Sequence, residues 1–311
     1  MIPFIRNENM KIYKRKRTWV MVAIVLVYVL LQIVNLKTTG GGATHENWRT
    51  QLEQDNDRFR QEATKPDPLE IEIKQAEKHI VLNQYYLQQN IPPNTNAWSF
   101  AVNQARNIIF AASLISILIA GEIVAAEFVS GTIKLLLTRS ASRTKIYMSK
   151  YIATILFGLL LSAAGILVSV LLGGFIFGFD GLADSYFYVK GHAVGEVPML
   201  QALLATYVLD IPFLLIATTL AFMTSAAFRS TTFSIVISLL TSLTGFIIAI
   251  AMDGWAWTKY FIFSHTDLTS YLYGDPSVDG VTLGYSLVFI GLHLAIMHLI
   301  SYPLFVKRDV A

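Results

Sequence analysis

The stretch IIFAASLISILIAGEIVAAEFVSGTIKLLLTRSASRTKIYMSKYIATILFGLLL, residues 108–161, decides the class of fold. Two long apolar runs flank a short segment that is rich in basic and hydroxyl side chains, residues 127–145. Each run is about as long as the roughly 20 residues that a helix needs to cross the hydrocarbon core of a bilayer. In lipid a helix satisfies its own backbone hydrogen bonds, so both runs are expected to be helical. The stretch therefore predicts two membrane spans joined by a polar loop.

The whole chain repeats this pattern. Of its 311 residues 54% are hydrophobic and 14% are charged, whereas about a quarter of the residues of a soluble domain are charged. The long apolar runs are 19–36, 108–126, 146–179, 199–228, 232–252 and 283–305. They are too long, too many and too poor in charge for buried helices of a soluble protein. We predict an all-α polytopic membrane protein with six transmembrane helices, the first of them retained because no small-residue cleavage site follows it.

Basic residues gather on one side of this predicted bundle, the side that holds both termini. They are Arg6, Lys11, Lys14, Arg15, Lys16, Arg17, Lys134, Arg139, Arg143, Lys145, Arg229, Lys307 and Arg308. Short loops rich in Lys and Arg face the cytoplasm. We therefore expect a cytoplasmic interfacial segment at 1–18, a cytoplasmic loop at 127–145 and a cytoplasmic tail at 306–311. The segments 37–107, 180–197 and 253–282 would lie outside.

The longest outer segment, 37–107, has apolar residues at helical spacing within 48–59 and 69–87. The sequence TKPDP, residues 64–68, would end one helix and begin the next, because proline breaks a helix interior but suits a first turn. We expect an extracellular helical hairpin here. A flexible, solvated connector is the alternative.

Within the loop 127–145, residues 132–138 are amphipathic and too few to cross a membrane. A turn rich in hydroxyls follows at 140–142, and a basic restart at Arg143. Such a short amphipathic helix either lies on the membrane surface or docks in a groove of another protein. The alternative is that its basic residues only fix the topology.

The loop also carries a recognisable set of residues: Glu127, Gly131-Thr132, Leu135-Leu136 and Ser142-Arg143. This set resembles the membrane subunits of ATP-binding-cassette (ABC) transporters of the second exporter type, which include the bacitracin-resistance and lantibiotic-immunity permeases. Residues 7–20 resemble the amphipathic basic segment before the first span of that family. Residues 259–274 resemble its outer segment, in which short re-entrant helices precede the last span. One departure is Ser140, where many members have proline.

The resemblance implies that residues 132–143 form a coupling helix in a groove of a separate ATPase subunit. The ATPase-coupling residues would be Glu127, Gly131, Thr132, Leu135, Leu136, Ser142 and Arg143. The interfacial helix, with Lys11, Lys14, Arg15 and Arg17, would touch the same subunit. The family further implies an exporter in the bacterial cytoplasmic membrane, with two ATPase copies and a second permease subunit, identical or different. The acidic outer hairpin hints at an amphipathic or cationic cargo, for instance an antimicrobial peptide.

No G-x-x-x-x-G-K-[ST] loop occurs in the chain, so ATP and Mg²⁺ are expected on the partner and not here. The chain has no cysteine, and its His293 and His298 have no carboxylate beside them on the last span. We expect polar packing from these histidines, with no metal, no cofactor, no catalytic residue and no nucleic-acid partner. Rival functions are a membrane sensor or scaffold that presents the outer hairpin, and a lipid-modifying enzyme, for which no reactive cluster is present.

Two acidic positions lie in or next to the apolar runs: Asp210 lies within the run 199–228, and Glu127 directly follows the run 108–126. Asp210 is either a substrate or gating residue that faces a subunit interface, or a structural carboxylate capped by hydroxyls such as Thr206, because an ionised group there is costly. Glu127 is expected to anchor the loop by pairing with Arg143 or Lys145.

Overall fold

The computed structural model describes residues 1–38, 47–132, 142–228, 230–276, 278 and 280–307. Six helices in this part of the chain are long and apolar enough to cross a membrane. They are α2 (Lys16–Thr38), α5 (Ala97–Ile123) with its continuation α6 (Ala125–Val129), α8 (Arg143–Phe177), α9 (Met199–Phe228), α10 (Thr231–Ala251) and α12 (Leu283–Val306). The predicted all-α polytopic membrane fold is confirmed.

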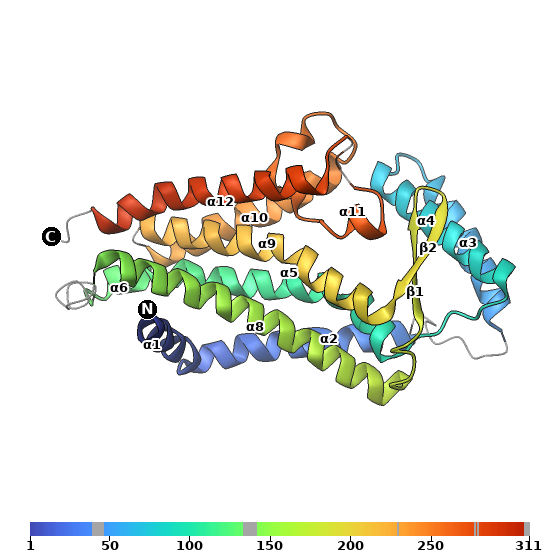
Figure 1. Cartoon of the computed structure of the whole chain (residues 1–311), viewed down its shortest axis with the longest axis horizontal. Helices are drawn as coiled ribbons and strands as arrows, with labels where there is room; N and C mark the ends of the chain where they lie inside the picture. The colour runs from blue at the N-terminus through green and yellow to red at the C-terminus, as the bar shows by residue number, and fades with distance from the viewer. Residues whose placement is uncertain (39–46, 133–141, 229, 277, 279, 308–311) are drawn as a thin grey trace.

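The six helices run along the long axis of the molecule (Figure 1). Helix α1 (Ile2–Tyr13) and the C-terminal end of α12 lie at one end of this bundle, which we call the termini end. Helices α3 (Trp48–Ala63) and α4 (Glu70–Gln89) lie at the opposite end, which we call the hairpin end. Helix α5 is the most buried span and α12 the least, so α5 is the centre of the bundle.

Small residues let α8 approach α5 closely. A Cβ atom on Gly158 would lie 2.6 Å from the hydroxyl of Ser116, and one on Gly165 would lie 2.5 Å from a methyl group of Ile108. Both distances are too short for any side chain, so these positions favour glycine. Close approach at small residues is the usual way in which helices associate in lipid. Apolar side chains such as Leu167 and Val288 face outward instead, as expected for a surface in contact with lipid.

The helical hairpin predicted between the first two spans is present. Helices α3 and α4 are joined by a buried hydrogen bond of 2.9 Å between Asn83 and Asn56. The rings of Phe59 and His79 stack with their centroids 4.7 Å apart. Helix α3 ends at Ala63 and α4 begins at Glu70, in agreement with the turn predicted at residues 64–68.

Two features of the hairpin end differ from the expectation. Strands β1 (Ser185–Lys190) and β2 (Ala193–Pro198) form an antiparallel hairpin with Gly191 at a φ of 60° in its turn. Helix α5 begins at Ala97 and not at Ile108, because the side chain of Asn96 accepts hydrogen bonds from the backbone N–H groups of Trp98 and Ser99 and caps the helix there.

Residues 253–282, predicted to hold short helices, contain η1 (Thr258–Tyr260), η2 (Ile262–His265) and α11 (Ser270–Tyr273). These turns lie over the hairpin end of α9, α10 and α12 (Figure 1). They bring side chains of the last third of the chain against α5 and α9, which creates a cavity described below.

Candidate functional site

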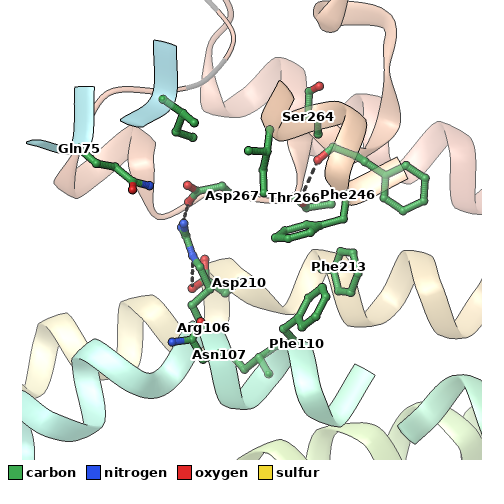
Figure 2. A pocket seen from close by; sticks show the side chains of 15 residues that line it. Gln75, Arg106, Asn107, Phe110, Asp210, Phe213, Phe246, Ser264, Thr266 and Asp267 are labelled. Atoms are coloured by element: carbon green, nitrogen blue, oxygen red, sulfur yellow. Dashed lines mark hydrogen bonds and ion pairs between the residues drawn. The ribbon is translucent and has the colours of Figure 1, made fainter. Parts of the chain in front are cut away.

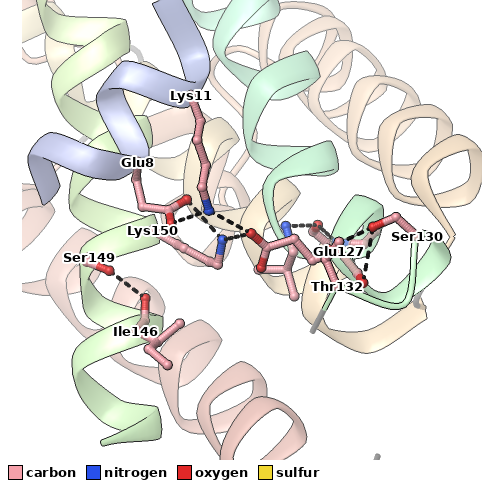
Figure 3. A network of polar contacts seen from close by, with 11 residues as sticks. Glu8, Lys11, Glu127, Ser130, Thr132, Ile146, Ser149 and Lys150 are labelled. Carbon is pink, nitrogen blue, oxygen red and sulfur yellow. Dashed lines mark hydrogen bonds and ion pairs between the residues drawn. The ribbon is translucent and has the colours of Figure 1, made fainter. Parts of the chain in front are cut away.

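Four charged side chains meet at the termini end (Figure 3). The Lys150 ammonium lies 2.9 Å from a carboxylate oxygen of Glu8 and 2.7 Å from one of Glu127. Lys11 contacts the same two carboxylates, at 2.8 and 3.1 Å. We call these four residues the ionic cluster. It joins α1, α6 and α8, elements that are far apart along the chain.

The buried charges of the ionic cluster each need a partner of opposite charge. The side chain of Lys150 is 0% exposed and that of Glu8 is 5% exposed, and a buried charge is tolerated only when it is paired. Burial alone would raise the pKa of Glu8, but Lys150 and Lys11 outweigh it and hold that pKa below its ordinary value. Burial likewise opposes the charge of Lys11, yet the hydrogen bonds that Lys11 donates to Glu8 and Glu127, and the negative charge of both carboxylates, raise the pKa of Lys11.

The predicted partners of Glu127 are wrong. Glu127 pairs with Lys11 and Lys150, whereas Arg143 donates a hydrogen bond of 2.7 Å to the backbone carbonyl of Val306 at the end of α12. Lys145 is exposed. The sequence predicted that Glu127 would pair with a basic residue at the other edge of the loop. The buried Lys150, further along α8, pairs with it instead.

A second ionic contact lies next to the cluster. Glu122 on α5 accepts hydrogen bonds from Arg15 and Arg17, which flank the junction of α1 and α2. Lys14, directly before Arg15, is exposed. Three of the four basic residues predicted for the interfacial helix therefore contact carboxylates of the bundle itself.

The base of the loop has a defined backbone. Helix α5 breaks at Val124, where the hydroxyl of Ser225 on α9 accepts hydrogen bonds from the N–H groups of Val124 and Ala125, at 3.3 and 3.0 Å. Gly131 has a φ of 72°, a conformation that favours glycine at the end of a helix. The Thr132 hydroxyl lies 2.8 Å from that of Ser130.

The remaining predicted coupling residues are divided. Leu135 and Leu136 lie outside the described residues. Ser142 caps α8 by accepting a hydrogen bond of 3.3 Å from the N–H group of Lys145. Both described edges of the loop are thus tied to the bundle, one through Glu127 and the other through Arg143.

A separate cavity of about 390 Å³ lies at the hairpin end (Figure 2). Its polar side is built by Arg106 on α5, Asp210 on α9 and Asp267 after η2. The Arg106 guanidinium contacts both carboxylates, lying 3.5 Å from Asp210. The hydroxyl of Thr269 donates a hydrogen bond of 2.8 Å to the other oxygen of Asp210.

These contacts bear on both interpretations of Asp210. The side chain is 4% exposed and faces a cavity lined by residues of its own chain. Its hydroxyl partner is Thr269 and not Thr206. Asp210 is therefore paired within its own chain, as a structural role requires, and it also lines a cavity, as a substrate-binding role requires.

The apolar side of the cavity is aromatic. The ring of Phe110 lies 5.0 Å from that of Phe213 and 4.7 Å from that of Phe246, measured between centroids. Phe263 extends this wall, with its centroid 6.3 Å from that of Phe213. The cavity is thus polar on one side and aromatic on the other.

Ion pairs hold helix α4 against the cavity. Its Ile71 and Gln75 contribute to the lining. Lys74 lies 2.9 Å from Asp253, and Lys78 lies 3.0 Å from Asp275. Burial would lower the pKa of Lys74, but the hydrogen bonds that its ammonium donates to Asp253 and Glu70 raise it.

The histidines have structural partners. His298 on α12 lies 2.7 Å from the hydroxyl of Tyr147 on α8. His293 lies near the backbone carbonyl of Phe289 in its own helix. His265 is fully buried between the hydroxyl of Ser286 and the carbonyl of Lys259, and this burial lowers its pKa. Among the described residues no group of His, Cys, Asp or Glu could hold a metal ion.

Sequence reasoning missed Glu8, Lys150, Arg106 and Asp267. Lys150 had a usable signal, because it is a lone charge inside an apolar run. Arg106 lies just before the second run, so it does not stand out as a charge inside an apolar run. Glu8 and Asp267 carry no local signal, since each is one acid in a polar segment.

Comparison with known proteins gives a family and two relatives. A family model described as a protein of unknown function (DUF2705) matches residues 72–311. An uncharacterized protein of Bacillus subtilis (strain 168), YhcI, is 35% identical over 321 aligned positions that cover 100% of both chains. An uncharacterized membrane protein of the same organism, YdbK, is 27% identical over 199 positions, covering 63% of this chain and 76% of the relative. No solved structure matches.

Proposed function

The chain belongs to the DUF2705 family, and from that premise we propose that it is the membrane-spanning permease subunit of an ABC transporter, driven by a separate ATPase. In this proposal the ATPase binds at the termini end, where α1 lies beside the described edges of the loop, residues 127–132 and 142–145. ATP and Mg²⁺ are held by the ATPase and not by this chain. Two permease subunits and two ATPase subunits make up the transporter in the cytoplasmic membrane, and the cargo leaves the cell.

The observation that carries the proposal is the ionic cluster. Glu8, Lys11, Glu127 and Lys150 fasten α1 and the base of the loop to α8. A partner that pushes on α1 or on the loop would therefore move both together. Such a rigid connection suits a coupling surface, because a force applied there reaches the spans instead of only bending a loop.

Helix α5 extends this connection to the other end of the molecule. Glu122 contacts the arginines at the termini end, and Arg106 lies at the cavity at the hairpin end. These residues are 16 positions apart in one helix, about 24 Å at a rise of 1.5 Å per residue. Helix α5 is also the most buried span. It is a continuous element through which the two ends can influence each other.

Purification of the tagged full-length chain from bacterial membranes tests the proposal. An ABC ATPase should co-purify in an equal number of copies. Leu135→Asp or Leu136→Asp should abolish this association, because an unpaired charge in an apolar groove is costly. Leu69→Asp, an exposed leucine at the hairpin end, is the matched control and should leave it intact.

The outcome also separates the rival functions. If both loop variants associate normally with the ATPase, the loop does not bind the ATPase and its basic residues only fix the topology. Recovery of a folded protein with no ATPase, under conditions that preserve membrane complexes, would favour a sensor or scaffold that presents α3 and α4.

A further inference from the structure

The cavity at the hairpin end has the properties of a ligand site. Its volume of about 390 Å³ falls within the range of about 300–1,000 Å³ that is usual for small-molecule pockets. Such pockets are mainly apolar, with a few polar groups that orient the ligand. Four phenylalanines and the Arg106–Asp210–Asp267 group supply these two parts.

A second cavity of about 570 Å³ adjoins the first and shares Ile71, Gln75, Arg106 and Asp267 with it. It lies between α4 and the turns at 253–282 and is the more polar of the two. We call the first the aromatic cavity and the second the acidic cavity. Because they share a wall, one elongated ligand can occupy both.

The charges of the two linings do not balance. Their carboxylates are Asp210, Asp267, Glu70, Glu77, Asp253 and Asp275, their cationic side chains are Arg106, Lys74 and Lys78, and His192 also lines the acidic cavity. With the histidine neutral, six acids against three cations give a formal charge of −3.

The bases are also already engaged. The guanidinium of Arg106 contacts two carboxylates, and Lys74 and Lys78 contact Asp253 and Asp275. An anionic ligand would have to displace these partners and would meet a lining with a net negative charge, whereas that net charge attracts a cation.

One acceptor in the acidic cavity is unsatisfied. Asp253 is 6% exposed, and its Oδ2 contacts Lys74. Its Oδ1 is buried and has no hydrogen-bond partner among the residues that the structure describes. A buried acceptor without a donor is unfavourable. A donor group on a ligand would relieve that cost.

We propose that the aromatic and acidic cavities together bind an amphipathic organic cation, with its apolar body against the phenylalanines and its ammonium group beside Asp267. The aromatic faces add attraction for a cation close to them. Binding at this site does not depend on the proposed transport function. It concerns the purified chain alone, so the ATPase co-purification experiment and the binding experiment can fail separately.

A matched series of ligands tests the charge preference: 4-phenylbutylamine, 4-phenylbutan-1-ol and 4-phenylbutyrate share one apolar body and differ in the polar end. Binding to the full-length protein in phosphatidylglycerol nanodiscs is measured by titration calorimetry, with empty nanodiscs subtracted. The amine should bind at least tenfold more tightly than the alcohol, and the carboxylate most weakly. Equal binding of amine and alcohol, preference for the carboxylate, or no binding would overturn the proposal.

Two variants locate the binding. Asp267→Asn should remove most of the preference for the amine while leaving binding of the alcohol. Ala249→Phe places a ring in the aromatic cavity and should weaken both ligands at least tenfold. Asp57→Asn is the control, because Asp57 is exposed on α3 and pairs with Arg60 outside both cavities. Thermal unfolding verifies that each variant is folded, and wild-type binding by folded Ala249→Phe would refute the assignment.

A lipid amine is one source of such a ligand, and a water-soluble amine is the other. Nanodiscs that contain phosphatidylethanolamine distinguish them. Weaker binding of the amine in these nanodiscs assigns the site to the lipid headgroup. Unchanged binding assigns it to a soluble cation, and both results support the site.

Discussion

Replacing Lys150 by methionine tests whether the ionic cluster holds the termini end together. Methionine has a similar length, so the substitution removes the charge with little change in volume. It leaves the carboxylates of Glu8 and Glu127, which lay 2.9 and 2.7 Å from the Lys150 ammonium, dependent on Lys11 alone. Lys11 is 38% exposed and already contacts both of them.

The expected cost follows from burial. Removing one partner of a buried ion pair costs about 3–5 kcal/mol. Because Lys11 remains, we expect the lower end of that range, about 3 kcal/mol, which corresponds to a fall in Tm of about 6–12 °C. Adding Glu8→Gln to Lys150→Met should recover part of the loss, since it removes one of the carboxylates left behind.

Thermal unfolding of the detergent-purified protein, followed by tryptophan fluorescence, measures the effect. Lys145→Met is the matched control on the same helix, because Lys145 is exposed, and it should change stability by no more than about 0.5 kcal/mol. If Lys150→Met and Lys145→Met melt together with the wild type, the ionic cluster does not stabilise the fold. A double variant that melts lower than Lys150→Met alone would also contradict the pairing with Glu8.

Three further predictions concern topology, pH and the cavity. Single cysteines at Ser142 and Gln61 should react with an impermeant thiol reagent from opposite sides of the membrane, Gln61 from outside; the native chain has no cysteine, and labelling of Ser142 in intact cells would reverse the map. The lowered pKa of Glu8 contributes stability above its ordinary value of 4.5, and this is lost as pH falls through the lower folded-state pKa. Wild type should therefore lose Tm more steeply below pH 4.5 than Glu8→Gln, and parallel curves would contradict the shift. Asp210→Leu leaves Thr269 without its acceptor and should unfold about 1–3 kcal/mol more easily than Asp210→Asn, which keeps an oxygen there; equal melting of the two would remove the structural role.

The spans could be predicted from sequence because their signal is local. Length and lack of charge mark each run, and neither depends on what lies beside it in space. Run 146–179 corresponds to α8, which begins at Arg143 and ends at Phe177. Hydropathy does not predict the start of α5 at Ala97, because the capping side chain of Asn96 sets it. The strands at 185–198 carry no such signal, because SYFYVK and AVGEVP do not alternate strictly between apolar and polar residues.

The ionic cluster and the cavity could not be predicted in the same way. Glu8 and Lys150 are 142 residues apart, and nothing near Glu8 distinguishes it from another surface acid. Glu127 was recognised as an anchor, but its partners were sought among neighbouring bases instead of across the bundle. Asp210 was identified as costly, yet its pairing with Arg106 and Thr269 depends on how α5 and the turns at 253–282 pack.

The position of Lys150 has a consequence for synthesis of the protein. A lysine inside a span raises the cost of inserting that span into the bilayer. Glu8 and Glu127 both precede Lys150 in the chain, so the ribosome synthesises both acidic residues before it synthesises α8. Glu8 and Glu127, on the segments that flank the first two spans, are therefore available to pair with Lys150 when α8 inserts. The order of residues along the chain thus matches the order in which the charges are needed, and moving Glu8 to a later segment would leave α8 to insert with one partner fewer.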